Sequence, residues 1–134
     1  DGFARAEFYH PQRDQGTLMA HYRHRATADV FVWPGLQDIT AHVDFTAVAE
    51  AAERAGVQVA GFAPQAAYLL SAGILDRLLD VGEPGSAIFV RESAALQKLT
   101  SPAEMGELFK VIALARSTRI AWRGFAIGDR SHTL

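Results

Sequence analysis

The 134-residue sequence contains no cysteine. Disulfide bonds, thiolate nucleophiles and cysteine-ligated zinc are therefore excluded, and the composition fits a reducing compartment. No stretch approaches the roughly 20 consecutive apolar residues that a membrane-spanning helix needs. No secretory signal peptide is recognisable. We therefore expect no membrane span.

An excess of charge of either sign is also lacking. Thirteen basic and 15 acidic residues give a net charge of −2, and the basic residues are scattered along the chain. A nucleic-acid-binding surface would need a basic stripe, so no nucleic-acid partner is expected. With 49% hydrophobic and 21% charged residues, the chain has the composition of one folded domain with a modest core.

The familiar catalytic motifs are missing as well. The sequence has no glycine-rich phosphate or dinucleotide loop, no G-x-S-x-G elbow and no H-E-x-x-H pair. Its five histidines do not fall at recognised metal-ligand spacings, and no metal site is predicted. A self-sufficient hydrolase is therefore unsupported.

The clearest element is a helix over residues 44–56. Asp44 is a plausible N-cap, an apolar stripe follows, and Gly56 supplies the left-handed residue that ends a helix. The β-branched segment 57–63 then predicts a buried strand. A helix that leads directly into a buried strand favours an α/β fold with a partly parallel sheet.

The remaining elements are weaker. We expect a strand over 16–24, a helix over 64–82 that Gly73 breaks or bends, and a helix over 87–99. Further elements are a short helix opened by a capping box at Ser101 and Glu104 and ended by Gly106, and a terminal antiparallel pair of strands over 108–115 and 120–128. Four strands alone would leave a sheet edge unpaired, so further strands are expected N-terminal to Asp1.

Residues 34–45, "PGLQDITAHVDF", are the candidate site. If 38–44 is extended, Asp38, Thr40, His42 and Asp44 share one face, while Ile39, Ala41 and Val43 face the core. Such a polar face is suited to binding a cation or a guanidinium group. The alternative is a solvent-facing strand that ends in the N-cap Asp44, and periodicity does not decide between them.

Four phrases in the sequence resemble the C-terminal half of the MidA family of class I S-adenosylmethionine-dependent methyltransferases. They are "GTLMAHYRHR", "PGLQDITAHVDFTAVAEAAERAG", "GFAPQAAYLLSAGI" and "KLTSPAEMGELFKVIALAR", and together they span nearly the whole chain. "DITAHVDF" and "EMGELFKV" are the most specific pieces. The resemblance implies a Rossmann-like, mostly parallel sheet closed by an antiparallel terminal strand pair.

The resemblance also implies where the cofactor lies. Asp1 and Gly2 resemble the end of the fourth strand, where the family usually has an acidic residue, Tyr and Gly, and this sequence lacks the Tyr. The glycine-rich cofactor loop has no counterpart, so residues 1–134 would form the C-terminal part of a methyltransferase domain. This part would be inactive alone, with most of the S-adenosyl-L-methionine site outside it.

The methyl acceptor implied by the resemblance is an arginine side chain of a partner protein, with a respiratory complex I subunit as the leading candidate. Asp38, Thr40 and His42 are the predicted catalytic residues, and the implied compartment is the bacterial cytoplasm or the mitochondrial matrix. A non-catalytic assembly module and a metal-dependent hydrolase that uses His42, Asp38 and Asp44 are the alternatives. The sequence does not reveal the oligomeric state.

Overall fold

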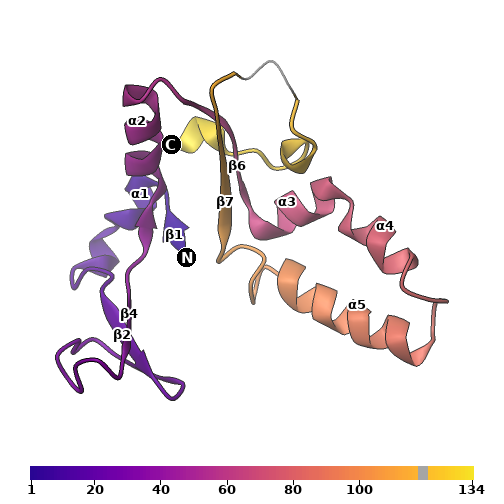
Figure 1. Cartoon of the computed structure of the whole chain (residues 1–134), viewed down its shortest axis with the longest axis horizontal. Helices are drawn as coiled ribbons and strands as arrows, with labels where there is room; N and C mark the ends of the chain where they lie inside the picture. Colours follow the sequence, from indigo (N-terminus) through magenta and orange to yellow (C-terminus); the bar gives the residue numbers. More distant parts are fainter. Residues whose placement is uncertain (118–120) are drawn as a thin grey trace.

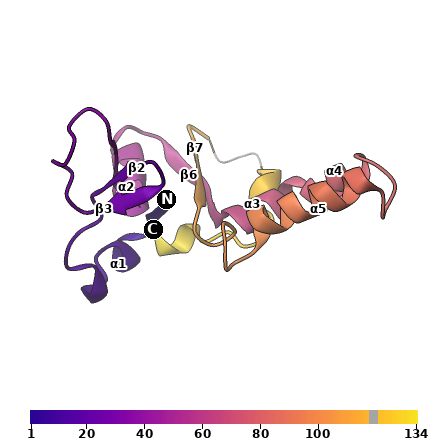
Figure 2. The same cartoon turned by 90° about the horizontal axis from the view of Figure 1, so that it is seen from below.

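The computed structural model describes residues 1–117 and 121–134, in an α/β arrangement (Figure 1). The helices α1 and α2 and the strands β1 (Gly2–Phe3), β2 (Met19–Tyr22) and β4 (Asp38–Thr40) lie on one side of the central pair. That pair consists of β6 (Gln58–Pro64) and β7 (Lys110–Ala115), and the helices α3, α4 and α5 lie on its other side. Seen from below, the helices α3 to α5 extend away from the strands (Figure 2). The helices are α1 (Arg5–Phe8), α2 (Phe45–Arg54), α3 (Gln65–Ala72), α4 (Ile74–Leu79) and α5 (Ala87–Thr100).

The strands form three small sheets with both parallel and antiparallel pairing. β1 (Gly2–Phe3) is parallel to β5 (Val43–Asp44). β2 (Met19–Tyr22) lies between β3 (Arg25–Thr27) and β4 (Asp38–Thr40), antiparallel to both. β6 (Gln58–Pro64) is antiparallel to β7 (Lys110–Ala115). The predicted α/β class is confirmed, and the antiparallel partner of β7 is β6.

The predictions that rest on the cap Asp44 and on the glycines Gly56 and Gly73 agree with the structure. Asp44 caps α2 by accepting a hydrogen bond from the backbone N–H of Ala47 at 3.0 Å, and Gly56 after the helix has φ +71°. The predicted helix over 64–82 is two helices, α3 and α4, with Gly73 between them at φ +91°. The strand expected over 16–24 ends at Tyr22, because Arg23 and His24 adopt positive φ in the turn to β3.

Two predicted elements are wrong in the described residues. After Ser101 the chain forms turns instead of a short helix, and the backbone N–H of Met105 bonds back to the carbonyl of Lys98 in α5. Residues 121–128 form no strand; they hold the 3₁₀ turn η2 (Arg123–Phe125), and residue 120 lies outside the described residues. The ring of Phe125 packs 5.4 Å from that of Tyr68 in α3, so this segment covers α3 and does not extend the sheet.

The core of the chain is small. Its fully covered side chains are mostly small ones, and Phe62 in β6 is the large exception at 2% exposure. Many large apolar side chains remain exposed, including Ile39 at 55% and Val43 at 41%. The described residues contain no helix that is both long enough and apolar enough to cross a membrane.

Candidate functional site

The parallel pair β1–β5 brings the two ends of the predicted site together. The backbone N–H of Val43 donates to the carbonyl of Asp1 at 3.0 Å, and Gly2 lies opposite Val43. Gly2 is buried, and a Cβ there would lie 2.6 Å from the carbonyl oxygen of Val43. The chain therefore has a glycine where β1 must approach β5 closely, and this approach positions Asp1 beside His42.

Asp1 and His42 form the closest contact between polar side chains of the site. His42 Nε2 lies 3.2 Å from Asp1 Oδ2, and the imidazole ring packs 5.1 Å from the ring of Phe3. Partial burial, followed by the nearby guanidinium of Arg13, lowers the pKa of His42 below its usual value of 6.5. The other ring nitrogen, Nδ1, is buried and finds no hydrogen-bond partner among the described residues. His42 is therefore a mainly neutral imidazole that faces Asp1 at neutral pH.

Thr40 and Asp38 lie in a strand, whereas His42 lies in the connection that follows it. Both belong to β4, whereas the chain leaves the strand at Ala41 and His42 before β5 begins. Thr40 Oγ1 lies 3.4 Å from Nδ1 of His21 on the neighbouring strand. The side chain of Asp38 is exposed, and its residue lies opposite His21 in the strand register.

A cavity of about 510 Å³ joins these elements. Thr40, Ala41 and His42 line it together, and Asp1 lines it from β1, whereas Asp38 is not among the lining residues. The structure thus brings together Thr40, His42 and Asp1 and leaves Asp38 apart. The remaining lining residues are Arg13, Gly16, Thr17, Met19 and His21.

The sequence analysis did not single out Arg13, Thr17 and His21 as members of this site. His21 falls within the strand predicted over 16–24, and its partner Thr40 becomes apparent only from the register of β2 with β4. Thr17 contacts the site through its hydroxyl, which accepts a hydrogen bond from the backbone N–H of His42 at 3.3 Å. No local pattern marks Arg13, because its approach depends on the turn η1 (Pro11–Arg13) that follows α1.

The prediction that Ile39, Ala41 and Val43 face the core is wrong. Ile39 and Val43 are exposed, and Ala41 is also exposed and lines the cavity with the polar residues. The physical reason is the interruption between β4 and β5, which ends the strict alternation of faces. Asp44, by contrast, is occupied as the cap of α2, and Arg5 Nε lies 3.8 Å from its second oxygen.

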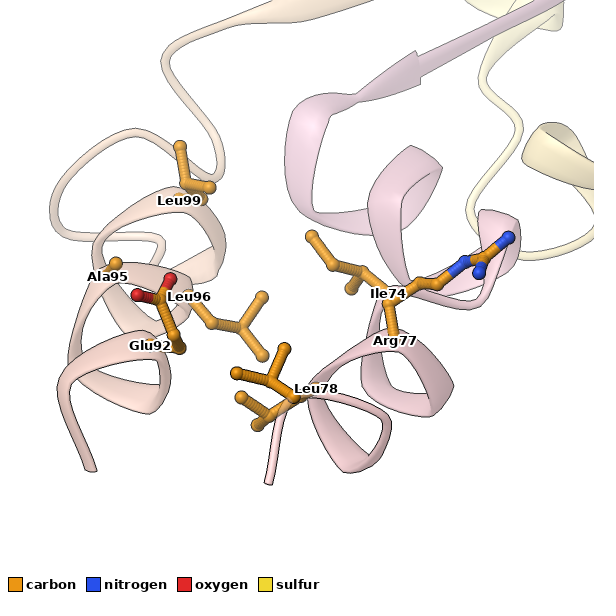
Figure 3. Close-up of a pocket in the computed structure, with 8 residues that line it drawn as sticks. Ile74, Arg77, Leu78, Glu92, Ala95, Leu96 and Leu99 are labelled. Carbon is orange, nitrogen blue, oxygen red and sulfur yellow. The ribbon is translucent and has the colours of Figure 1, made fainter. Parts of the chain in front are cut away.

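A second, mostly apolar cavity of about 180 Å³ lies between α4 and α5 (Figure 3). Leu78 and Leu96 point toward each other across it, while the guanidinium of Arg77 points away. This cavity holds no reactive constellation, since Glu92 is its only carboxylate.

The cavity beside Asp1 combines one carboxylate with hydroxyl and imidazole groups and with the guanidinium of Arg13. A carboxylate attracts a cation such as a sulfonium or a guanidinium, and the hydroxyl of Thr40 can orient a polar ligand. Among the described residues, no group of three or more His, Cys, Asp or Glu side chains is arranged to hold a metal ion. The site is thus suited to binding and orienting a polar ligand through protein groups.

Comparison with known proteins found one matching family model and similar solved structures. Residues 2–63 match a family model described as "Putative S-adenosyl-L-methionine-dependent methyltransferase". No curated protein matches the chain.

Two crystal structures from Burkholderia thailandensis are similar over 99% of this chain at 56% sequence identity. One is a native structure of an uncharacterised protein, with a TM-score of 0.93. The other, from the same superfamily, is described as a "likely methyl transferase" bound to S-adenosyl-homocysteine, with a TM-score of 0.92. The chain spans 36% and 34% of the lengths of these two proteins. The family model and the second structure are both described in terms of methyl transfer.

Proposed function

We propose that residues 1–134 form the C-terminal part of an S-adenosyl-L-methionine-dependent methyltransferase of the MidA type. The observation that carries the proposal is the 56% identity, over 99% of this chain, to a protein that binds S-adenosyl-homocysteine. The chain spans about a third of that protein. Its small core and its exposed apolar side chains, such as Ile39 and Val43, favour packing against further parts of a larger domain.

S-adenosyl-L-methionine supplies an electrophilic methyl group on a sulfonium centre. Asp1 and Gly2 are the residues of this chain that fit a place beside it. The carboxylate of Asp1 complements a positive charge, and Gly2 keeps β1 against β5 so that this carboxylate faces the cavity. His42 is a positioning residue in this proposal, because its Nε2 contact at 3.2 Å fixes the direction of Asp1.

We propose an arginine side chain of a partner protein, of the respiratory complex I subunit type, as the methyl acceptor. Its nitrogen must be held in line with the methyl group, and its charge must be balanced. Thr40 offers a hydroxyl inside the cavity, and Asp38 offers an exposed carboxylate at the start of β4. The bacterial cytoplasm is the proposed compartment, consistent with the bacterial source of the two similar structures.

The test uses the full-length protein with radiolabelled S-adenosyl-L-methionine and purified complex I subunits from the same organism. Mass spectrometry then identifies the methylated side chain. Binding of S-adenosyl-homocysteine, measured by calorimetry, is a separate readout of the cofactor site. Absence of cofactor binding would remove the methyltransferase proposal, and methylation of a residue other than arginine would remove the acceptor proposal alone.

Two variants separate the candidate carboxylates. Asp1→Asn is expected to weaken both cofactor binding and methyl transfer, whereas Asp38→Asn is expected to lower methyl transfer about tenfold or more with cofactor affinity retained. Asp80→Asn is the matched control, because Asp80 is an exposed carboxylate beside Arg77 at the end of α4, beyond the β6–β7 pair (Figure 1). Unchanged turnover in Asp38→Asn would exclude Asp38 from the site.

A further inference from the structure

Two cationic side chains approach the same aromatic ring. The guanidinium carbon of Arg13 lies 3.9 Å from the centroid of Phe3, and the amine of Lys110 lies 5.7 Å from that centroid. The two residues come from η1 and from β7, which are far apart in the sequence. The fold therefore places two positive charges close together around Phe3.

Neither cation has a carboxylate partner within 4 Å among the described residues, although both are half-buried. Both side chains donate hydrogen bonds to backbone carbonyls: Arg13 donates to the carbonyl of Glu7, and Lys110 donates to the carbonyl of Glu107. The carboxylate of Glu107 is instead held by Arg130 at 2.9 and 3.1 Å. The other described Lys and Arg side chains without an ion pair are exposed to solvent: Arg23, Arg25, Arg54, Lys98 and Arg116.

This arrangement leaves positive charge partly desolvated and incompletely balanced. Removing a cation from water costs free energy unless an opposite charge compensates for it. Burial lowers the pKa of Lys110, and the attraction of the Glu107 and Glu7 carboxylates, which acts in the opposite direction, does not offset it. An anion between Arg13 and Lys110 would supply the missing compensation.

The space for such an anion is a cavity of about 570 Å³ lined by Phe3, Glu7, His10, Gln12, Arg13 and Lys110. Arg13, Lys110 and His10 supply hydrogen-bond donors among its lining residues. Nδ1 of His10 accepts from the backbone N–H of Gln12 at 3.3 Å, so a neutral His10 carries its proton on Nε2 and can donate from there. Glu7, an exposed side chain, is the single carboxylate among the lining residues.

We propose that this cavity binds an oxyanion, a carboxylate or a phosphate group, between the guanidinium of Arg13 and the amine of Lys110. Arg13 also lines the neighbouring cavity that holds Asp1 and His42, so the oxyanion lies next to the proposed methyl-transfer site. The oxyanion is either the carboxylate of the bound cofactor, which rests on the proposed function, or a separate ligand, which does not.

The test uses crystals of the full-length protein soaked in sodium selenate, and calorimetric titration of the protein in solution with inorganic phosphate. We expect anomalous density for selenium between Arg13 and Lys110.

Lys110→Met keeps the aliphatic stem but removes the charge, and it should weaken phosphate binding about tenfold. Arg13→Lys keeps the charge but loses the planar fork, and it should weaken binding severalfold. Lys98→Met on α5, an exposed lysine, is the control and should bind phosphate like the parent.

A second arm identifies the source of the oxyanion by repeating the soak with S-adenosyl-homocysteine bound. Displacement of selenate assigns the site to the cofactor carboxylate, whereas selenate and cofactor bound together assign it to a separate ligand. Three results would overturn the oxyanion site. They are the absence of selenium density, an unchanged phosphate affinity in Lys110→Met, and a carboxylate of the protein itself bound between the two cations. Methyl transfer measured on the same protein tells this failure apart from failure of the proposed function.

Discussion

At the scale of single residues, Gly2 is the position where the candidate site tolerates least change. A Cβ at Gly2 would lie 2.6 Å from the carbonyl oxygen of Val43 and 2.7 Å from the ring of Phe45. These are backbone and packed aromatic atoms, which cannot move aside cheaply. We therefore expect Gly2→Ala to destabilise the protein by about 1–3 kcal/mol, as overpacking does, measured by urea unfolding.

Gly16→Ala is the control for this prediction. Gly16 has φ +76° and open space around its Cα, so an added methyl group there tests backbone strain without steric overlap. Its expected cost is about 1 kcal/mol. A Gly2→Ala protein as stable as the parent would show that β1 does not need this close approach to β5.

His42 predicts a pH dependence of folding. Burial and the charge of Arg13 lower the pKa of His42 in the folded protein below 6.5, while the unfolded chain keeps the ordinary value. The unfolded state therefore binds more protons between these two values, and stability falls as pH decreases below about 6.5. His42→Gln, which can still donate toward Asp1, should flatten this part of the stability curve. Urea unfolding between pH 5 and 8, with NMR titration of His42, measures the effect, and equal slopes in the two proteins would contradict it.

The sequence anticipated part of the arrangement at this scale. Alternation placed Asp38, Thr40 and His42 on one face and Ala41 on the other, whereas in the structure Thr40, Ala41 and His42 line one cavity and Asp38 does not. Alternation assumes one continuous strand, and the chain here passes from β4 in one sheet to β5 in another. His21 and Arg13 reach the cavity through strand register and through a turn, and these long-range relations leave no local pattern.

At the scale of elements, the cap of α2 gives a prediction that separates structure from chemistry. Asp44 Oδ1 accepts the backbone N–H of Ala47 at 3.0 Å, so Asp44→Ala should cost about 1 kcal/mol of unfolding free energy. Asp44→Asn keeps an acceptor and should retain most of that stability. Thermal unfolding measured by circular dichroism provides the comparison. Equal losses in both variants would point to the charge contact with Arg5 at 3.8 Å as the main contribution.

Elements with local signals were predictable, and those set by tertiary contacts were not. The helix α2 has its own cap, stripe and terminal glycine, and the strand β6 follows it directly. The capping-box pattern at Ser101 and Glu104 does not start a helix, because the turns after Ser101 form hydrogen bonds with neighbouring helices. The carbonyl of Gly106 accepts the backbone N–H of Ala66 at the start of α3, and the N–H of Met105 donates to the carbonyl of Lys98 in α5.

The prediction of a strand over 121–128 was wrong for a related reason. Residues Arg123–Phe125 form a 3₁₀ turn that contacts α3 and β6. The ring of Phe125 lies where a Cβ on Gly61 would be only 2.3 Å from it, so the missing side chain in β6 admits this ring. Phe125 is the large apolar side chain of the segment that is partly covered, whereas Trp122 and Ile127 remain 45% and 63% exposed, so hydrophobicity alone did not indicate which residue packs.

At the scale of the whole molecule, the C-terminal segment closes one edge of β6 without being a strand. The backbone N–H of Arg130 donates to the carbonyl of Phe62 at 2.6 Å, and the N–H of Phe62 donates to Asp129 Oδ1 at 3.0 Å. Arg130 also forms a paired contact with Glu107 next to β7. Unpaired backbone N–H and C=O groups on a strand edge can pair with strands of other chains. By occupying these groups of Phe62, the C-terminal segment protects the β6–β7 pair from such association.

Asp129 is the residue through which this protection can be tested. Burial alone would raise its pKa, but hydrogen bonds from Ser131 and from the backbone of Phe62 outweigh burial and lower the pKa. Asp129→Ala leaves the N–H of the buried Phe62 without its acceptor, so we expect a loss of about 1–3 kcal/mol and faster amide exchange at Phe62. Asp129→Asn retains the acceptor oxygen and should keep Phe62 protected. Hydrogen exchange followed by mass spectrometry measures both variants. Unchanged exchange at Phe62 in Asp129→Ala would mean that the Asp129 carboxylate does not protect this amide, which leaves the bond from Arg130 to the Phe62 carbonyl as the principal link between the C-terminal segment and β6.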